Sequence, residues 1–295
     1  MTFYIVTPVY NAIQWLPSCI RSVADQVSED INVHHHIQDG GSSDGSLEWL
    51  QAWQRETQGK NGYKFTFTSC KDNGMYDAIN KAWDIMPDDA DVILHLNADE
   101  QCTLDALKSV AKAFQQHPEA DILLCSHLVV DKKGGYICHR RPVHPCKWCS
   151  QAITEIITCD CFHKASNFRK NGLRFDTQWQ SLGDFVFYRN LLQTNPRIVT
   201  EPGIFATIFT VTGNNLGWSD ITHQEHRKLQ AKKTRLIKIY RTFAILYFAL
   251  RIRLCDCIRT KPKKYDLYCE NESERREKKI KRPTIHWACR IVGER

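Results

Sequence analysis

The stretch Val92-Ile93-Leu94-His95-Leu96-Asn97-Ala98-Asp99-Glu100 is an apolar run that ends abruptly in a polar, acidic cluster. The run is typical of a buried strand that delivers Asn97, Asp99 and Glu100 to the carboxyl edge of a sheet, where open α/β folds bind ligands. Two carboxylates there suit Mg²⁺ or Mn²⁺, because these ions take oxygen ligands and share them with substrate phosphates. The alternative interpretation is an acidic helix start, where Asp and Glu complement the helix dipole.

Segments of strand character alternate with segments of helical spacing along most of the chain. Strands are predicted over residues 3–6, 31–38, 63–68, 92–96, 121–126 and 204–211. Helices are predicted over residues 15–23, 47–53, 77–86, 104–114 and 183–193. Loops and short strands are expected between residues 131 and 163. This alternation predicts an α/β fold with a mostly parallel central sheet covered by helices.

The charge of the 295-residue chain is unevenly distributed, although its composition is ordinary for a globular protein. Residues 1–223 hold 19 Lys and Arg against 25 Asp and Glu, a net charge of −6, whereas residues 224–295 carry the remaining 21 and 8, a net charge of +13. A basic segment of this kind indicates an anionic partner. We therefore divide the chain into a catalytic domain (1–223), a basic amphipathic helical segment (224–258) and a charged tail (259–295).

Residues 232–257 place apolar side chains at spacings of three and four, with Lys and Arg beside them. This pattern predicts a basic amphipathic helix on an anionic membrane surface, and packing of the helix on the catalytic domain is the alternative. No apolar run approaches the roughly 18 to 20 residues that span a bilayer, and no signal segment is recognised. We expect a cytoplasmic protein, peripheral at the inner face of the cell membrane. After Pro262, residues 270–282 predict a solvated helix or a disordered tail.

The 13 cysteines are interpreted as reduced thiols of a cytosolic protein. Cys-x-x-Cys at 146 and 149 can supply two zinc ligands, and Cys159, Cys161 and His163 could add others. The second pair is Cys-x-Cys, which departs from the usual paired motif, so zinc binding by these four thiols is left open. The run from His34 to His36 alternates faces on a strand and cannot converge on one metal.

Four polar loops follow the predicted strands in order: Thr7-Pro8-Val9-Tyr10-Asn11, Asp39-Gly40-Gly41-Ser42-Ser43-Asp44-Gly45, Asp72-Asn73-Gly74-Met75-Tyr76-Asp77-Ala78-Ile79-Asn80-Lys81 and Asn97-Ala98-Asp99-Glu100. In this order and spacing they resemble the donor-binding half of the family 2 inverting glycosyltransferases, which have the GT-A fold. The resemblance covers about residues 3 to 215 and points to the bacterial surface-polysaccharide type.

A nucleotide-sugar site is what this resemblance implies. Thr7, Pro8 and Tyr10 would border the nucleotide, and Asp39 and Asp72 would hydrogen-bond its base. The loop of Asn97, Asp99 and Glu100 stands where the family usually has a polar-x-Asp-Asp or Asp-x-Asp sequence. Asp99 would help to hold the ribose and, with Glu100 as a second candidate ligand, an Mn²⁺ or Mg²⁺ ion on the diphosphate. Such an ion stabilises the charge that develops on the leaving group.

Inverting transfer needs a base that takes the proton of the acceptor hydroxyl. The segment Gly183-Asp184-Phe185-Val186-Phe187-Tyr188-Arg189 resembles the family's downstream acid at a helix start, so the resemblance implies that Asp184 is this base. A carboxylate satisfied by helix amides is the alternative. The chain departs from the family at Cys159-Asp160, at Thr212-Gly213-Asn214-Asn215-Leu216-Gly217 and mildly at Gly183. A position of His223 near the diphosphate is one interpretation, and a surface histidine is the alternative.

The sequence therefore predicts a metal-dependent inverting glycosyltransferase. It would move a sugar from a nucleotide-sugar donor, expected to be UDP-linked, to a hydroxyl of a glycan or lipid-linked acceptor in cell-surface polysaccharide biosynthesis. The alternative is a non-catalytic nucleotide-sugar or nucleic-acid binding protein with a basic tail. Nucleic acid is not expected as a partner, because the aromatic residues of 232–257 form an apolar stripe and do not interleave with the charges.

Overall fold

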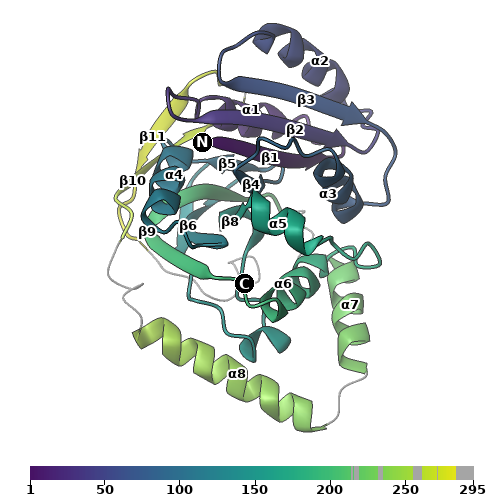
Figure 1. The fold of residues 1–295 in the computed structure, drawn as a ribbon, viewed down its shortest axis with the longest axis vertical. Helices are drawn as coiled ribbons and strands as arrows, with labels where there is room; N and C mark the ends of the chain where they lie inside the picture. Colours follow the sequence, from purple (N-terminus) through teal and green to yellow (C-terminus); the bar gives the residue numbers. More distant parts are fainter. Residues whose placement is uncertain (214, 216–218, 232–234, 255–260, 271, 284–295) are drawn as a thin grey trace.

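The central sheet of the chain combines a parallel half with a mixed half (Figure 1). The computed structural model describes residues 1–213, 215, 219–231, 235–254, 261–270 and 272–283. The parallel half consists of β1 (Thr2–Val9), β2 (Asn32–Asp39), β3 (Tyr63–Ser69) and β4 (Val92–His95). The mixed half consists of β5 (Glu100–Cys102), β6 (Ile122–Asp131), β7 (Tyr136–Arg140), β8 (Cys161–Lys164) and β9 (Ile198–Val211).

The strand order is β3-β2-β1-β4-β8-β6-β9-β5, and β7 pairs with β6. Strand β1 pairs in parallel with both β2 and β4, and β6 pairs in parallel with β9. The strands β5, β7 and β8 are short and antiparallel to their neighbours. The predicted α/β fold with a mostly parallel sheet is confirmed.

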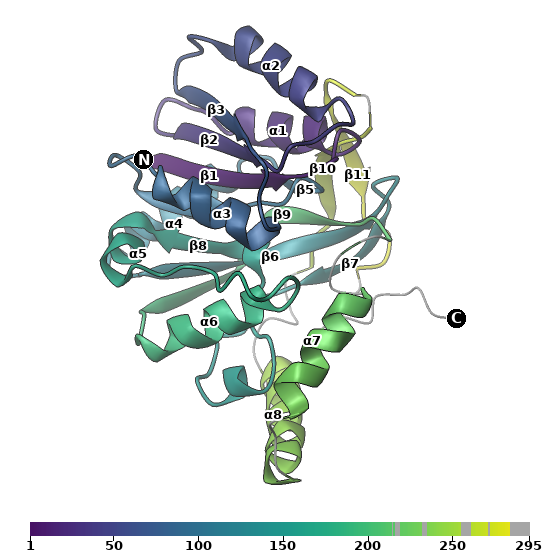
Figure 2. The same cartoon turned by 90° about the vertical axis from the view of Figure 1, so that its right-hand side faces the viewer.

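Two apolar layers cover the two faces of the sheet (Figures 1 and 2). One layer packs α1 (Leu16–Ala24), α2 (Ser46–Thr57) and α4 (Ala106–Gln116) on one face. The other packs α3 (Met75–Asp84), α5 (Ala165–Asn171) and α6 (Gly183–Gln193) on the opposite face. Successive residues of a strand point to opposite faces, so Phe3 and Ile5 belong to the first layer and Tyr4 and Val6 to the second.

Strand β1 is longer than predicted, because it continues through Thr7 and Pro8 to Val9. Proline cannot donate a hydrogen bond to a neighbouring strand, so it was expected to end β1. Pairing with β4 has already ended at Val6, whose carbonyl accepts from Leu96 N at 3.0 Å. Pro8 lies on that same side of the strand, and its missing N–H therefore costs no ladder bond.

The prediction of a helical or disordered segment at 270–282 is wrong. Residues Lys264–Tyr268 and Arg275–Lys279 form an antiparallel hairpin, β10 and β11, that packs on the catalytic domain. Tyr265 and Leu267 alternate with polar residues and are buried against β6 and β9. The Arg275 guanidinium donates to the Asp25 carboxylate at 2.6 Å and 3.0 Å. The overlooked signal was the alternation of apolar and polar residues, which is typical of a strand, inside a highly charged segment.

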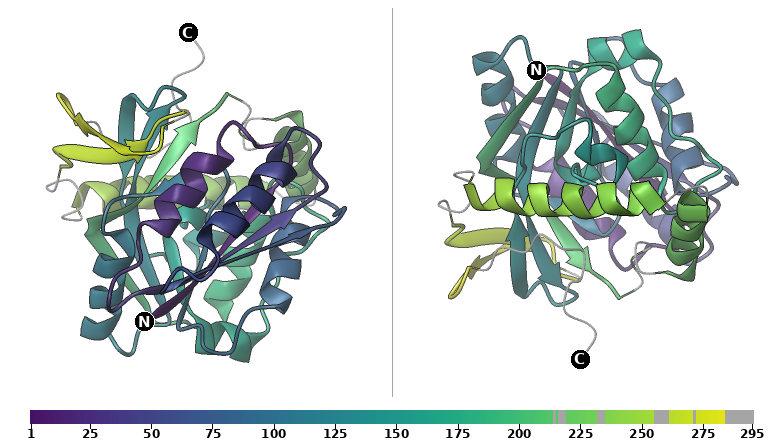
Figure 3. Two further views of the ribbon diagram at one scale, coloured as in Figure 1. Left: turned by 90° about the horizontal axis from the view of Figure 1, so that it is seen from above. Right: turned by 90° about the horizontal axis from the view of Figure 1, so that it is seen from below.

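Helices α7 (Asp220–Ala231) and α8 (Arg235–Leu254) follow the catalytic domain (Figures 2 and 3). The boundary predicted at 223/224 falls inside α7. In the described part of the chain, no helix combines the length and apolar character needed to cross a bilayer. Residues 232–234 and 255–257 of the predicted amphipathic helix, and residues 284–295 of the predicted tail, lie outside the described residues.

The hairpin packing predicts that Leu267 contributes to the stability of the whole domain. We expect Leu267→Ala to lower the free energy of unfolding by about 2 to 4 kcal/mol, because the side chain is 2% exposed and its loss leaves a cavity. The matched control is Leu246→Ala on α8, where the side chain is 61% exposed and the change should stay within about 0.5 kcal/mol. Chemical denaturation measures both, and equal effects would contradict a docked hairpin.

Candidate active site

A cavity of about 1220 Å³ opens at the carboxyl ends of β1, β2 and β4. Its walls come from separate parts of the chain, at residues 8–15, 40–41, 71–78, 97–100, 140–142, 154–160 and 177–184. Parallel pairing brings the first four of these segments to one edge of the sheet. A space of this size accommodates a nucleotide-sized ligand together with part of a second substrate.

Most of the residues predicted for the site line this cavity. They are Pro8, Tyr10, Asp72, Asn97, Asp99, Glu100 and Asp184. Thr7 and Asp39 do not line it, because both are fully buried behind the strand ends. The Thr7 hydroxyl lies 3.0 Å from His35 Nε2, inside the sheet. Their predicted contacts with a donor remain predictions.

Asp39 organises the loop that follows β2. Its carboxylate accepts hydrogen bonds from the Gly41 and Ser42 amides, from Ser42 Oγ at 2.5 Å and from Ser69 Oγ at 2.6 Å. The loop thereby turns sharply at Gly40, where an added Cβ would lie 2.8 Å from Asp72 Oδ2. Glycine at this position lets the loops after β2 and β3 approach closely, so Asp72 reaches the cavity beside Gly40.

The turn after β4 gives its two acidic residues different hydrogen-bond partners. Glu100 Oε2 accepts the amide of Asn97 at 2.8 Å, so the Glu100 carboxylate closes the turn from which Asp99 projects. Asp99 Oδ2 accepts a hydrogen bond from Asn215 Nδ2 at 3.2 Å, in the segment after β9. Burial raises the pKa of both carboxyl groups, and for Glu100 the neighbouring charge of Asp99 adds to the effect.

Asp184 lies in the first turn of α6, where its Oδ1 accepts the amide of Phe185 at 2.7 Å. Burial raises the pKa of this carboxyl to about 6. The Tyr76 hydroxyl donates to the Ser181 carbonyl at 2.9 Å and accepts the Asp184 amide at 3.2 Å. A Cβ at Gly183 would lie 2.5 Å from the Tyr76 ring, which explains why glycine precedes the acid in this chain.

Glu225 of α7 is a functional candidate that the sequence analysis missed. Its buried carboxylate accepts three consecutive backbone amides of the loop before α6: Gln180 at 2.6 Å, Ser181 at 3.0 Å and Leu182 at 2.9 Å. These bonds fix the entry into α6 and hence the place of Asp184. The residue lies just beyond the boundary predicted at 223, and only the spacing of Thr222 and Glu225 on one helical face could have indicated it.

A second functional candidate that the sequence analysis missed is a pair of residues on the opposite wall of the cavity. His127 Nδ1 and Asp160 Oδ2 are 2.7 Å apart, both side chains are buried, and both residues line the cavity. Burial raises the Asp160 pKa, and the hydrogen bond with His127 opposes that effect. Lys132, Arg140 and Arg141 line the same wall and give it positive charge. A wall with this charge suits an anionic or hydroxyl-bearing second substrate.

The remaining predictions concern histidines and the segment after β9. His34 Nε2 and His36 Nδ1 both lie 2.9 Å from Thr66 Oγ1, and burial lowers the pKa of both to about 4. His223 is exposed and does not line the cavity. Of the segment 212–217, residues 214, 216 and 217 lie outside the described residues.

The cavity offers a donor set that fits a hard divalent cation. Asp99 supplies a partly buried carboxylate with a raised pKa, a charge whose burial a nearby cation would offset. Mg²⁺ and Mn²⁺ sites of this kind commonly use one or two protein carboxylates and complete their shell with substrate phosphates and water. One accessible carboxylate is therefore sufficient, and Asp99 is the residue that presents it.

Comparison with proteins of known sequence supports a family assignment. The profile of glycosyl transferase family 2 matches residues 4–178. The PGL/p-HBAD biosynthesis glycosyltransferases of Mycobacterium tuberculosis and Mycobacterium bovis are 25% identical over 240 residues, which cover 79% of this chain and 86% of each relative. These relatives are therefore matched over most of their length.

Solved structures share the fold. S. aureus TarS 1-349 in complex with UDP is similar with a TM-score of 0.55 at 15% identity, over 88% of this chain and 74% of that one. The chain spans 44% of a longer TarS structure. The mannosyltransferase PcManGT of Pyrobaculum calidifontis, in complex with GDP-Man and Mn²⁺, is similar with a TM-score of 0.57 at 16% identity. The similarity covers 84% of this chain and 70% of that one.

The family profile covers more than half of the chain, and its matched region contains the three loops of the parallel half and the acidic turn after β4. The sheet and its covering helices agree with the GT-A fold of the solved structures. The chain belongs to glycosyltransferase family 2 and is a glycosyltransferase of GT-A fold.

Proposed function

We propose that the protein is an inverting glycosyltransferase that uses a UDP-linked sugar and Mn²⁺ or Mg²⁺. The acceptor would be a hydroxyl of a glycan or lipid-linked oligosaccharide in cell-surface polysaccharide biosynthesis. One observation carries the proposal: Asp99 and Asp184, both partly buried, line the same cavity from opposite halves of the fold. A cation-binding carboxylate and a basic carboxylate are the two groups that inverting transfer from a sugar diphosphate requires.

The donor side of the cavity consists of the loops after β1, β3 and β4. Pro8 and Tyr10 would border the nucleotide, and Asp72 would hydrogen-bond its base. A divalent ion held by Asp99 would supply positive charge to the departing diphosphate. UDP and GDP-mannose in the two similar structures support a nucleotide-sugar donor, and Mn²⁺ in one of them supports the cation.

Asp184 would act on the acceptor side as the general base. With a pKa near 6, a large fraction of the carboxyl is ionised at neutral pH, yet it is a stronger base than an exposed aspartate. It would accept the hydroxyl proton as the acceptor oxygen attacks the anomeric carbon from the side opposite the diphosphate. Glu225 and Tyr76 would hold Asp184 in place through the loop that precedes α6.

Helix α8 would attach the enzyme peripherally to the cytoplasmic face of an anionic membrane. Ile239, Phe243, Leu246 and Leu250 follow at spacings of three and four and are all at least half exposed. Such a stripe buries apolar area in the headgroup region, and nearby cations such as Arg241 attract anionic lipids. Lipid-linked acceptors are located at that surface, which gives the attachment a function.

The base assignment predicts the kinetics of Asp184→Asn. We expect kcat to fall by about 10²- to 10⁴-fold with donor affinity retained, because Asn keeps the shape of the side chain and cannot accept the proton. Asp176→Asn in the preceding turn is the matched control, since Asp176 does not line the cavity. NMR of the product should show the anomeric configuration inverted, and retention would overturn the mechanism.

The pH dependence tests the same residue without a mutation. The Asp184 pKa is raised to about 6, so its active, ionised form is lost as the pH falls through that value. We expect kcat/KM to drop about tenfold per pH unit below 6 and to level off above it. A profile that stays flat between pH 7 and pH 5 would exclude Asp184 as the essential base.

The cation assignment separates Asp99 from Glu100. We expect UDP with Mn²⁺ to raise the melting temperature of the wild type, because a ligand bound to the native state stabilises it. Asp99→Asn should weaken this Mn²⁺-dependent binding by about tenfold or more, and EDTA should abolish transfer. Glu100→Gln should leave this Mn²⁺-dependent binding within about threefold, because the Gln amide oxygen can still accept the Asn97 amide and close the turn. An equal loss in Glu100→Gln would make Glu100 a ligand as well.

The membrane assignment predicts the behaviour of a double variant in α8. We expect Phe243→Ser with Leu246→Ser to lose about tenfold or more in binding to vesicles that contain phosphatidylglycerol, because both side chains belong to the exposed stripe. Ala249→Ser, on another face of the helix, should bind like the wild type. Co-sedimentation measures the bound fraction, and unchanged binding of the double variant would refute the assignment.

A further inference from the structure

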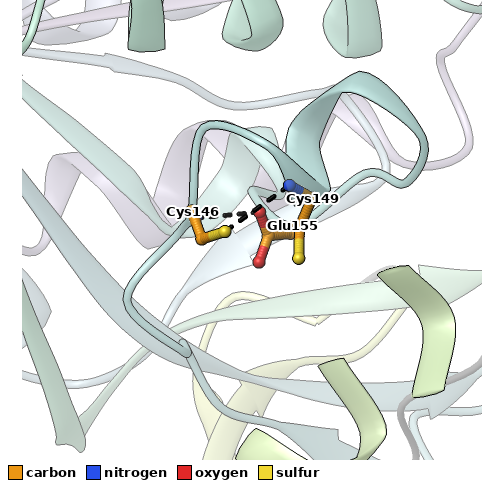
Figure 4. Close-up of side chains that lie close together, drawn as sticks. All are labelled: Cys146, Cys149 and Glu155. Atoms are coloured by element: carbon orange, nitrogen blue, oxygen red, sulfur yellow. Dashed lines mark hydrogen bonds between the residues drawn. The ribbon is translucent and has the colours of Figure 1, made fainter. Parts of the chain in front are cut away.

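Two thiols and a carboxylate meet in the loop between β7 and β8, outside the cation site of the active cavity (Figure 4). Cys146, Cys149 and Glu155 each offer one ligand atom, and these atoms lie within 4.8 Å of one another. Cys149 opens a short 3-10 helix, η1 (Cys149–Gln151), and Glu155 lies four residues after it. The segment brings the three side chains together without contributions from distant parts of the chain.

Backbone hydrogen bonds hold this arrangement of side chains. The Cys146 amide donates to Glu155 Oε2 at 2.9 Å, and the Cys149 amide donates to Cys146 Sγ at 3.5 Å. The Ser150 amide donates to the Cys146 carbonyl at 3.0 Å and closes the turn. A ligand set that is already positioned lowers the entropy lost when an ion binds.

The cluster differs from the four-thiol zinc site weighed from the sequence. Cys159 packs in the layer under α1 and α4, whereas Cys161 lies in the opposite layer, with its Sγ 3.4 Å from His163 Nε2. Neither thiol joins Cys146 and Cys149 among the described residues. The third side chain of the cluster is instead Glu155, which no cysteine motif indicates.

The charges around the cluster balance for a divalent cation. Two thiolates and one carboxylate carry three negative charges, and Arg251 NH1 lies 3.3 Å from Glu155 Oε1 with its positive charge. A dication therefore makes the buried group neutral as a whole. The Glu155 side chain is 0% exposed, so an unbalanced charge there would be costly. Sulfur ligands favour Zn²⁺ over the Mg²⁺ or Mn²⁺ that oxygen ligands prefer.

We propose that Cys146, Cys149 and Glu155 bind one Zn²⁺ ion, with water in the fourth tetrahedral position. On binding, the two thiols release their protons to solvent, two sulfur–zinc bonds and one oxygen–zinc bond form, and no electrons are transferred. The ion stabilises the loop of residues 142–158, which supports α8 on one side and forms a wall of the active cavity on the other. The proposal does not depend on the donor or the acceptor.

Helix α8 packs on this loop, so an ion bound by the loop would also support the helix. Arg251 donates to the His144 carbonyl as well as to Glu155, and the Tyr240 hydroxyl donates to the Trp148 carbonyl. The Trp148 ring contacts the rings of Tyr240 and Tyr247, with centroid distances of 5.7 Å and 5.0 Å. All of these contacts on the loop side come from residues 144–155, the segment that the ion would hold.

Metal content and spectroscopy of the full chain test this site. We expect protein purified under reducing conditions to contain about one zinc per chain by elemental analysis. The metal-free chain should bind one equivalent of Co²⁺ and develop a thiolate-to-cobalt absorption band, a readout that needs no variant. Cys146→Ser and Glu155→Gln should weaken Zn²⁺ binding by about tenfold or more, whereas Cys70→Ser, at an exposed thiol, should retain it.

Two control measurements distinguish this zinc site from the active cavity and from a folding defect. Asp99→Asn should keep its zinc, which separates this site from the cation of the active cavity. Circular dichroism shows whether Cys146→Ser is folded. If the variant is unfolded, the cobalt titration of the wild type still tests the proposal. Absence of a thiolate band in the reduced chain would overturn the proposal, as would a Cys146–Cys149 disulfide whose reduction yields no Co²⁺ binding.

Discussion

Parallel pairing of β1 with β2 on one side and β4 on the other is the constraint on which the site depends. The pairing sends the polar residues after these strands to one edge, although they are separated by many residues in sequence. Gly40 then allows the loops after β2 and β3 to meet, because a Cβ there would displace the Asp72 carboxylate from its present position. The buried Asp39 holds that turn from behind and thereby shapes the cavity wall.

Burial of carboxylates around the cavity lowers the stability of the fold at neutral pH. Asp99, Glu100 and Asp184 have raised pKa values because they are removed from water. The native state therefore holds protons that the unfolded chain has lost, and stability decreases as the pH rises from the unfolded pKa values through the folded ones. In the proposed mechanism a cation bound by Asp99 would offset this cost, so ligand binding would also stabilise the fold.

Sequence patterns predicted the parts of the structure that depend on local periodicity. The strands before Asp39 and Asn97 and the helix that begins at Gly183 follow directly from apolar spacing and turn residues. The hairpin of β10 and β11 was missed because charge concealed the alternation of Tyr265 and Leu267. Glu225 and the pair of His127 with Asp160 were missed for another reason. Their partners lie more than 30 positions away, and only the tertiary fold brings them together.

Glu155 connects two regions that the sequence analysis divided, residues 1–223 and residues 224–258. Glu155 is one of the residues that line the active cavity, and its buried carboxylate contacts Arg251 of α8 and lies beside the two thiols of the η1 turn. A shift of α8 against the catalytic domain would have to break the Arg251 contact and change the charge balance at the loop. This contact orients the exposed stripe of α8 relative to the cavity. If α8 attaches the enzyme to a membrane as proposed, the wall formed by residues 154–160 would lie beside the attached helix, on the side from which a lipid-linked acceptor would approach.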